Sequence, residues 1–219
     1  MGVWVERGDV IDQQARAFLN ACDGVAGNTH KPEWSEPYLD WNVGLAAPRH
    51  MQVWVETVDV TNTQGKSFGH VFGGIPSYTS TAEGWHNGTG ASKRITDIGF
   101  PAKIRLRWQS LVEPKTYQIA VDIPQWVRDE MVSAKQGFCK FSREWRDDYR
   151  NYITFGMAPG GIVKVWVGGA CLDSIEVGRY QAEVDPRGPY EGRSNGRYIK
   201  LEPENKDYIE KHGIPYGTW

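Results

Sequence analysis

The sequence lacks an excess of basic residues and lacks a long apolar run. Its 219 residues include 25 lysines and arginines against 27 aspartates and glutamates, a formal net charge of -2. Proteins that bind a nucleic-acid backbone normally carry a clear positive excess, so we expect no nucleic-acid partner. The longest apolar run, at residues 160–172, is interrupted by Lys164 and is shorter than the roughly 20 residues that cross a bilayer. We expect no transmembrane segment.

Catalytic and metal-binding motifs are also missing from the sequence. The histidines never stand at HxH or HExxH spacing, and no G-x-S-x-G nucleophile elbow occurs. Gly156, Gly160 and Gly161 match neither the dinucleotide-binding nor the P-loop pattern, and the alternation after them predicts a hairpin turn at residues 158–161. The sequence therefore predicts no catalytic residue, no metal site, no cofactor and no enzyme. Paired carboxylates can come from any part of a fold, which leaves a hydrolase as an alternative.

Cysteines are few, and they do not form a metal-binding set. Cys22, Cys139 and Cys171 are far apart in the sequence, whereas structural zinc sites usually place their ligands in close pairs. In an oxidising compartment the preferred arrangement is a disulfide between Cys139 and Cys171 with one free thiol. The alternative is three reduced cysteines, because sequence alone does not show that two Cβ atoms meet.

Aromatic and turn-forming residues are abundant. The chain holds 10 tryptophans, 10 tyrosines, 7 phenylalanines, 25 glycines and 12 prolines, a composition that favours short strands over long helices. We expect Trp41 and Trp108 on the core-facing side of their strands, and we expect the first two strands to form an antiparallel hairpin because few residues separate them. Alternating apolar and polar residues predict strands within residues 38–48, 51–60, 102–123, 151–157, 162–167 and 174–184.

Two segments have the pattern of short helices. Residues 124–135 begin with Pro124 and place Val127 and Met131 four apart, and residues 203–212 are followed by Gly213 as a left-handed cap. Residues 141–151 are charged and aromatic, and they predict either another short helix or an irregular link. We therefore expect residues 37–219 to form a single β-rich α+β domain, an antiparallel two-sheet sandwich-like fold with two or three short helices.

Two features bear on the surface of this domain. Lys103, Arg105 and Arg107 form a basic row on the polar side of a predicted strand. Such a row could seat an acidic partner, although solvated basic side chains on an exposed sheet face are commoner. Residues 69–97 are rich in glycine and have little periodicity, which predicts a long loop. Loops of this length are often functional, and the alternative is a surface loop without a role.

The amino terminus does not have the pattern of a secretory signal. Acidic residues and Arg16 stand where an apolar stretch would be needed. The tetrapeptide LNAC, Leu19–Cys22, nevertheless resembles a lipoprotein cleavage site, which makes Cys22 a candidate for lipidation. The alternative is chance together with a short amphipathic helix. We interpret residues 1–36 as an N-terminal extension or tether.

Four motifs resemble, in this order, a Gram-negative family of unknown function, domain-of-unknown-function family 2931. The likeness extends over residues 37–219, and members of the family are mostly small predicted lipoproteins. No catalytic residues of the family are carried over. The motifs are PYLDWNVGLAAPRHMQVWVE at residues 37–56, RLRWQSLVEPKTYQIAVDIP at 105–124, YITFGMAPGGIVKVWVGG at 152–169 and DYIEKHGIPYGTW at 207–219.

The resemblance implies a function as well as a fold. Some members look like immunity proteins that bind lipase effectors of type VI secretion in the periplasm. It therefore implies a cognate lipase or phospholipase effector as partner and a periplasmic, possibly lipid-anchored protein, or a cytoplasmic one if this amino terminus is native. Under this hypothesis the candidate partner-binding residues are Tyr78, Trp85, His86 and Arg94. The alternative is an envelope- or carbohydrate-binding β-sandwich module.

Overall fold

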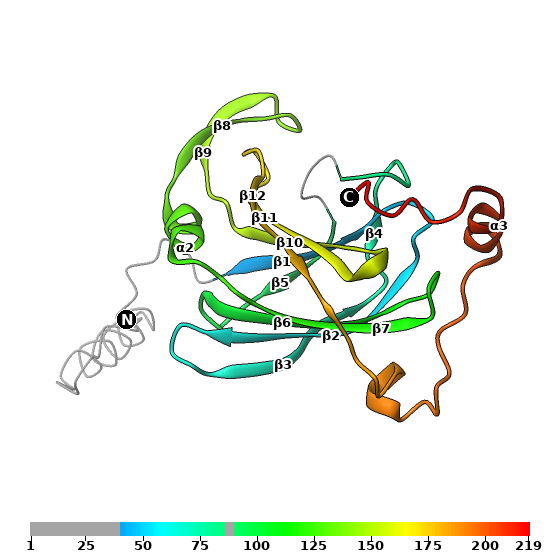
Figure 1. Ribbon diagram of the computed structural model, residues 1–219. Helices are drawn as coiled ribbons and strands as arrows, with labels where there is room; N and C mark the ends of the chain where they lie inside the picture. The colour runs from blue at the N-terminus through cyan, green and yellow to red at the C-terminus, as the bar shows by residue number, and fades with distance from the viewer. Residues whose placement is uncertain (1–39, 86–89) are drawn as a thin grey trace, which may run out of the picture. The chain divides into compact units, whose positions relative to one another are not determined.

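A computed structural model of the chain describes residues 40–85 and 90–219 (Figure 1). The chain divides into two units, Met1–Glu36 and Pro37–Trp219, and the description below concerns the second. The predictions for residues 1–36, for Cys22 and for His86 lie outside the described residues. Two main sheets and two α-helices make up the described part, so the predicted β-rich α+β class with two sheets is confirmed.

The first main sheet is mixed. Strand β1 pairs in parallel with β10 and β4 and antiparallel with β5. Strands β10, β11 and β12 follow one another as antiparallel neighbours, and β10 lies between β11 and β1. The strands of this sheet are β1 (Trp41–Ala47), β4 (Ser77–Tyr78), β5 (Ala91–Ile95), β10 (Tyr152–Ala158), β11 (Ile162–Gly168) and β12 (Ile175–Gln181).

The second main sheet is antiparallel throughout and has the order β13-β7-β6-β2-β3. A separate two-stranded sheet consists of β8 (Lys135–Cys139) and β9 (Glu144–Asp148), which form a hairpin. The strands of the second main sheet are β2 (Val53–Asn62), β3 (Ser67–Gly74), β6 (Pro101–Ser110), β7 (Lys115–Asp122) and β13 (Glu183–Val184).

The helices agree with the sequence pattern. Helix α2 (Gln125–Val132) turns Val127 and Met131 into the core, and helix α3 (Pro203–His212) ends at Gly213, whose φ of 74° is the left-handed value expected of a glycine cap. Two short 3₁₀ turns, η1 (Pro159–Gly161) and η2 (Pro189–Gly192), complete the elements. No helix in the described part of the chain is long and apolar enough to cross a membrane.

The core lies between the two main sheets and is built from alternate residues of both. Trp41 on β1 and Trp108 on β6 are fully buried, as predicted, and the indole N–H of Trp41 donates to the carbonyl oxygen of Gly99 at 2.9 Å. Valine, isoleucine and leucine from β2, β6, β10 and β11 fill the space around them. The turn at residues 158–161 also forms as predicted, with Gly160 and Gly161 at φ of 80° and 75°.

The predicted hairpin between the first two strands is wrong. Strand β1 belongs to the mixed sheet and β2 to the antiparallel sheet, so the short connection between them passes from one sheet to the other. His50 in this connection has a φ of 64°, which makes a tight corner. Both strands direct apolar side chains to the same core, and facing sheets satisfy that pattern as well as a hairpin would.

Two further expectations about local structure are wrong. Residues 69–97 are not one long loop, because β3, β4 and β5 include much of this range. Residues 141–151 contain β9 and not a helix. In both cases the strands form by pairing with partners that lack a strong pattern of their own, so tertiary context decides the structure.

Candidate functional site

The residues predicted to bind a partner are spread along the mixed sheet. Tyr78 on β4 pairs with Ala47, and Arg94 on β5 pairs with Asn42, five residues away along β1. That spacing corresponds to about 16 Å. Arg94 is exposed and forms an ion pair with Asp40. Burial, with the nearby Glu202 carboxylate, raises the pKa of Tyr78 to about 12.

Trp85 has a different environment from the other predicted residues. Its ring packs edge-on against Trp166, with centroids 5.8 Å apart, and it lies over Gly156, where a Cβ atom would come within 2.8 Å of the ring. This contact holds Trp85 against β10 and β11. Tyr78, Trp85 and Arg94 therefore do not form one patch, and their role in binding stays a prediction.

A buried carboxylate, Glu113, joins segments that are far apart in the sequence. Its side chain is 2% exposed and accepts hydrogen bonds from the hydroxyls of Ser110 at 2.8 Å and Tyr216 at 3.0 Å and from the backbone N–H of Gly160 at 3.0 Å. The Tyr117 hydroxyl lies 3.2 Å from the same carboxylate. We call these five residues the Glu113 cluster.

The Glu113 cluster raises the pKa of both tyrosines. Burial and the Glu113 carboxylate raise the pKa of Tyr117, and partial burial with the same carboxylate raises that of Tyr216 to about 12. Three of the four motifs named above meet here, since Glu113, Gly160 and Tyr216 belong to the second, third and fourth. Every oxygen of the carboxylate is hydrogen-bonded, so this arrangement suits a structural role.

A second buried ionic cluster contradicts the prediction of an exposed basic row. Lys103 and Arg105 are exposed, but Arg107 is buried and forms ion pairs with Glu56 at 2.6 Å and with Asp185. The segment from Asp185 to Ile199 covers the outer face of the second sheet at this point, and the guanidinium also donates to the carbonyl oxygen of Gly188. This covering segment comes from nearly 80 residues further along the chain, which the local pattern does not indicate.

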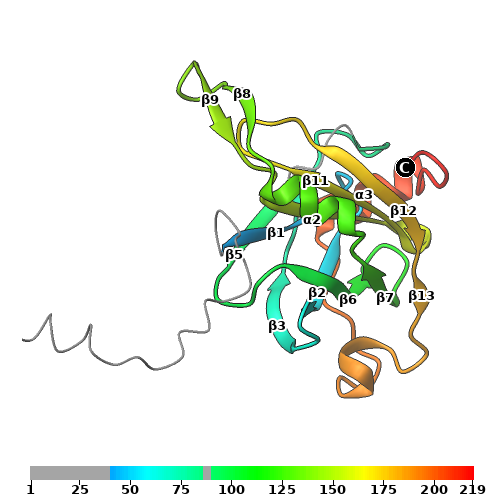
Figure 2. The same cartoon turned by 90° about the vertical axis from the view of Figure 1, so that its left-hand side faces the viewer.

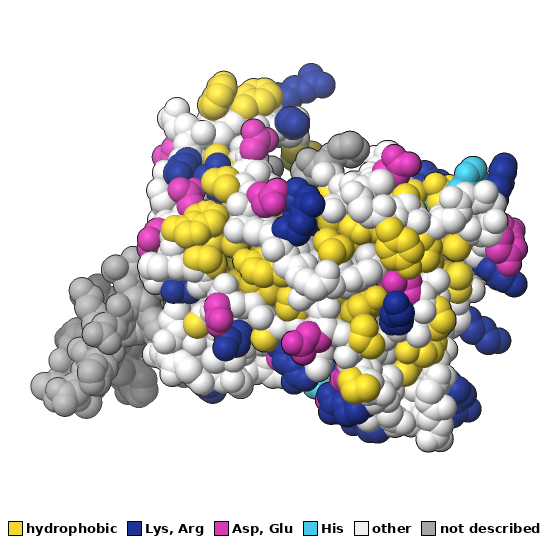
Figure 3. All heavy atoms as spheres, in the orientation of Figure 1, with side chains coloured by type: hydrophobic (Ala, Val, Ile, Leu, Met, Phe, Trp, Pro, Cys, Tyr) yellow, Lys and Arg dark blue, Asp and Glu magenta, His cyan; other side chains and the backbone are white. Residues whose placement is uncertain are grey.

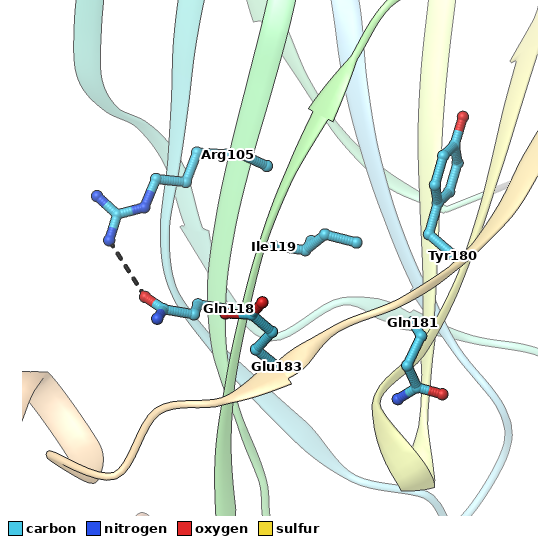
Figure 4. Close-up of a pocket in the computed structure, with 7 residues that line it drawn as sticks. Arg105, Gln118, Ile119, Tyr180, Gln181 and Glu183 are labelled. Carbon is cyan, nitrogen blue, oxygen red and sulfur yellow. Dashed lines mark hydrogen bonds between the residues drawn. The ribbon is translucent and has the colours of Figure 1, made fainter.

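A polar groove of about 560 Å³ lies between the two main sheets, where β7 and β12 approach each other (Figure 4). Ile119 points toward Tyr180, and on the other side of β7 Arg105 donates a long hydrogen bond of 3.4 Å to Gln118. Gln181 donates to the carbonyl oxygen of Gly160 at 2.7 Å. The groove lining offers one carboxylate, Glu183, and neither histidine, cysteine nor serine, so it contains no pair suited to acid–base or nucleophilic chemistry.

The β8–β9 hairpin carries the most exposed large apolar side chains in the described part of the chain. Phe141 at its tip is 103% exposed, Trp145 on β9 is 69% exposed and Phe138 on β8 is 43% exposed. Phe138 and Trp145 stand opposite each other in the register, with ring centroids 5.7 Å apart and planes tilted by 59°. We call residues 135–148 the aromatic hairpin.

The aromatic hairpin projects away from both main sheets (Figures 1 and 2). In the space-filling view, apolar and basic side chains gather over it at the top of the molecule (Figure 3). Lys140, Arg143 and Arg146 are the basic residues of its outer half. Surfaces where aromatic rings and arginine meet in the open are typical of protein-binding sites.

The base of the hairpin is held by covalent and polar contacts. Cys139 and Cys171 form a disulfide that ties β8 to the loop after β11. The carboxylate of Asp148 accepts the backbone N–H of Cys171 at 2.8 Å, and Arg150 donates to Glu130 on α2 at 2.9 Å. The rings are therefore presented on a supported element.

The sequence gave only a weak signal for this site. Residues 141–151 attract notice as charged and aromatic, yet their apolar residues share no period with a core-facing pattern. That lack of period indicates rings that do not face a core. The described residues place no three His, Cys, Asp or Glu side chains together where they could hold a metal ion, and the predicted absence of catalysis stays a prediction.

The family model described as "Protein of unknown function (DUF2931)" matches residues 25–217, which is most of the chain. No curated protein and no solved structure matches the chain at a significant level.

Proposed function

The chain belongs to the DUF2931 family, and we propose that it is an immunity-type protein that binds and inhibits a cognate type VI secretion lipase or phospholipase effector. The inhibition is non-catalytic: the protein occludes the effector by occupying the surface through which substrate enters. It needs no cofactor for this role.

The observation that carries the proposal is the aromatic hairpin. Three large apolar side chains exposed on one projecting element leave apolar surface in water, which a soluble domain rarely does without a binding role. Aromatic residues are enriched among the few that dominate protein–protein affinity. A hairpin fixed at its base loses little conformational entropy when it enters a cleft, which favours tight binding.

The disulfide supports a location outside the cytoplasm. Disulfides persist in oxidising compartments such as the periplasm and are rare where thiols are kept reduced. We propose a periplasmic location, with lipidation at Cys22 as the route to a membrane anchor. Mass spectrometry of the protein from cell envelopes would detect the lipid, and an unmodified Cys22 would contradict the anchor.

The alternative function is an envelope- or carbohydrate-binding module. Sugar-binding aromatic platforms need exposed rings, and Phe138 and Trp145 could supply them. Their rings are tilted by 59° and do not form a flat platform, which favours a protein partner. Specific binding on a glycan array that is lost on replacing Trp145 would favour the alternative.

The proposed function is tested with the lipase or phospholipase encoded beside this protein. We expect the two purified proteins to form a stable complex in size-exclusion chromatography and the enzyme to lose its activity on a phospholipid substrate as this protein is added. Full lipase activity in the presence of an excess of this protein would contradict the proposal.

A further inference from the structure

The aromatic hairpin has a second face, and this face borders a pocket. The pocket has a volume of about 570 Å³ and lies between the hairpin and the loop of residues 169–174. Its apolar lining comes from Phe138 and Phe141, from the disulfide-bonded Cys139 and Cys171, and from Leu172. The volume falls in the range of pockets that bind small ligands, which is enough for one or two large side chains. We call this space the hairpin pocket.

The rim of the hairpin pocket is positively charged. Lys140 and Arg146 line it, and both are exposed. In the part of the chain that the structure describes, neither forms an ion pair or a side-chain hydrogen bond, whereas Lys135 at the base of the hairpin is bonded to Glu130 at 2.7 Å. The one acidic residue in the lining is Asp173, and its backbone carbonyl is bonded to Arg150.

The walls of the hairpin pocket are held together before any partner binds. The disulfide joins them, and the hydrogen bond from the Cys171 N–H to Asp148 adds a second link. At Gly137 the hairpin approaches the loop so closely that a Cβ atom would lie 2.2 Å from the carbonyl oxygen of Cys171. A preformed pocket of this kind binds without the entropic cost of assembling it.

We propose that the hairpin pocket binds a loop of the effector that carries a carboxylate next to a large apolar side chain. This proposal rests on the proposed function and names the chemistry of its partner. The apolar side chain lies against Leu172, Phe141 and the disulfide, and the carboxylate is held by the guanidinium of Arg146 with Lys140 beside it. An arginine fork matches the two oxygens of a carboxylate, which gives orientation as well as attraction.

The test compares two double variants that change the net charge equally. Lys140→Glu/Arg146→Glu reverses the rim, and Lys200→Glu/Lys211→Glu makes the same change at two exposed positions of the C-terminal segment. Isothermal titration with the purified neighbouring lipase measures the affinity of each variant and of the unaltered protein. We expect the rim variant to bind at least about 10-fold more weakly and the control to bind nearly as tightly as the unaltered protein. Because all four side chains are exposed, matching thermal unfolding curves will show that both variants fold.

Each other outcome has a definite meaning. If the unaltered protein binds the lipase and both variants weaken binding equally, or neither does, the assignment of the pocket is overturned while the proposed function stands. If the unaltered protein does not bind the lipase, the proposed function fails and the assignment fails with it.

Two other occupants are tested with the same variants. We expect no binding to vesicles of phosphatidylglycerol and phosphatidylethanolamine, and a monomer in analytical ultracentrifugation. Vesicle binding that only the rim variant loses would assign the pocket to an anionic membrane surface and overturn the proposal. A dimer that only the rim variant loses would assign it to a second copy of this chain, with the same consequence.

Discussion

The Glu113 cluster and the aromatic hairpin have opposite surroundings. At Glu113 a charged group is removed from water, and donors from three distant segments complete its hydrogen bonds. On the hairpin apolar rings stand in water, and no part of the described chain covers Phe141 or most of Trp145. The fold explains the first arrangement, because a buried carboxylate without partners would be costly. It does not explain the second.

The positions of the family motifs follow the same division. Glu113, Tyr117, Gly160 and Tyr216 lie within the motifs that carry the resemblance, whereas residues 125–151, which include the whole hairpin, lie between the second motif and the third. The motifs therefore mark residues that hold the domain together. Recognition of a particular partner is assigned to a segment outside them.

The largest effect is expected from the interior of the domain. Arg107→Ala leaves the buried carboxylates of Glu56 and Asp185 without their counter-charge, and we expect it to lower the free energy of unfolding by about 3–5 kcal/mol. Urea unfolding measures the change. Arg105→Ala, two residues away on the same strand but exposed, is the matched control and is expected to change stability by no more than about 0.5 kcal/mol. Equal losses from the two substitutions would contradict the account of the buried cluster.

The disulfide belongs to both regions, since it stabilises the chain and supports the hairpin. Replacing Cys139 and Cys171 by serine removes a link across 32 residues, and loop-closure entropy predicts a loss of about 3 kcal/mol in unfolding free energy. We also expect weaker binding to the lipase, because the walls of the hairpin pocket come apart. Affinity that is unchanged in a variant with reduced stability would show that the disulfide does not support the binding surface.

Alkaline pH is expected to act on the Glu113 cluster and not on the hairpin. The pKa of Tyr117 is raised above the ordinary 10.0, and that of Tyr216 is raised to about 12. A raised pKa in the folded state means that the protonated hydroxyl stabilises the fold below pH 10 and that this contribution is lost as the pH passes 10 and approaches 12. Thermal unfolding between pH 8 and pH 12 measures the decline.

The control for this pH dependence is Glu113→Gln. Without the carboxylate, ionised tyrosines no longer meet a like charge, so the variant starts less stable and declines less steeply. Identical slopes for the two proteins would mean that the decline has its origin elsewhere, for instance at Tyr78, whose pKa is also raised to about 12.

The smallest effect is expected at the edge of the mixed sheet. Arg94→Ala breaks an exposed ion pair with Asp40 and is expected to lower the free energy of unfolding by less than about 1 kcal/mol. Because Arg94 lies far from Tyr78 along β1, we expect the Arg94→Ala and Tyr78→Ala variants to bind the lipase with nearly unchanged affinity. A loss of 10-fold or more from either would move the binding surface from the hairpin to this edge.

Much of the fold could be predicted because strict alternation leaves few choices. Trp108 and its neighbours on β6 face the core as the pattern requires, and Gly213 ends α3 as its place after the helix indicates. What failed depended on distant segments. Arg107 has the pattern of an exposed residue until the chain around Asp185 covers it, and β1 joins β10, more than 100 residues away, where β2 was expected.

The candidate site was less predictable than the fold. Exposure of Phe141 follows from the absence of anything packed against it, and a sequence does not state an absence of contacts. The residues predicted instead, Tyr78, Trp85 and Arg94, stood out because they are large side chains in a segment without period. Trp85 shows the difficulty, since its ring packs against Trp166 within the domain.

The measurement that tests the central claim most directly is the affinity of Phe138→Ala/Phe141→Ala/Trp145→Ala for the neighbouring lipase. Because these rings make few contacts inside the domain, we expect the unfolding free energy to stay within about 0.5 kcal/mol of its original value. Binding is expected to weaken by about 100-fold, as it does when the dominant residues of an interface are truncated. Trp126→Ala removes a ring that is 41% exposed on α2, outside the hairpin, and serves as the control. A triple variant that is folded and binds as tightly as the unaltered protein would contradict the assignment of recognition to the hairpin.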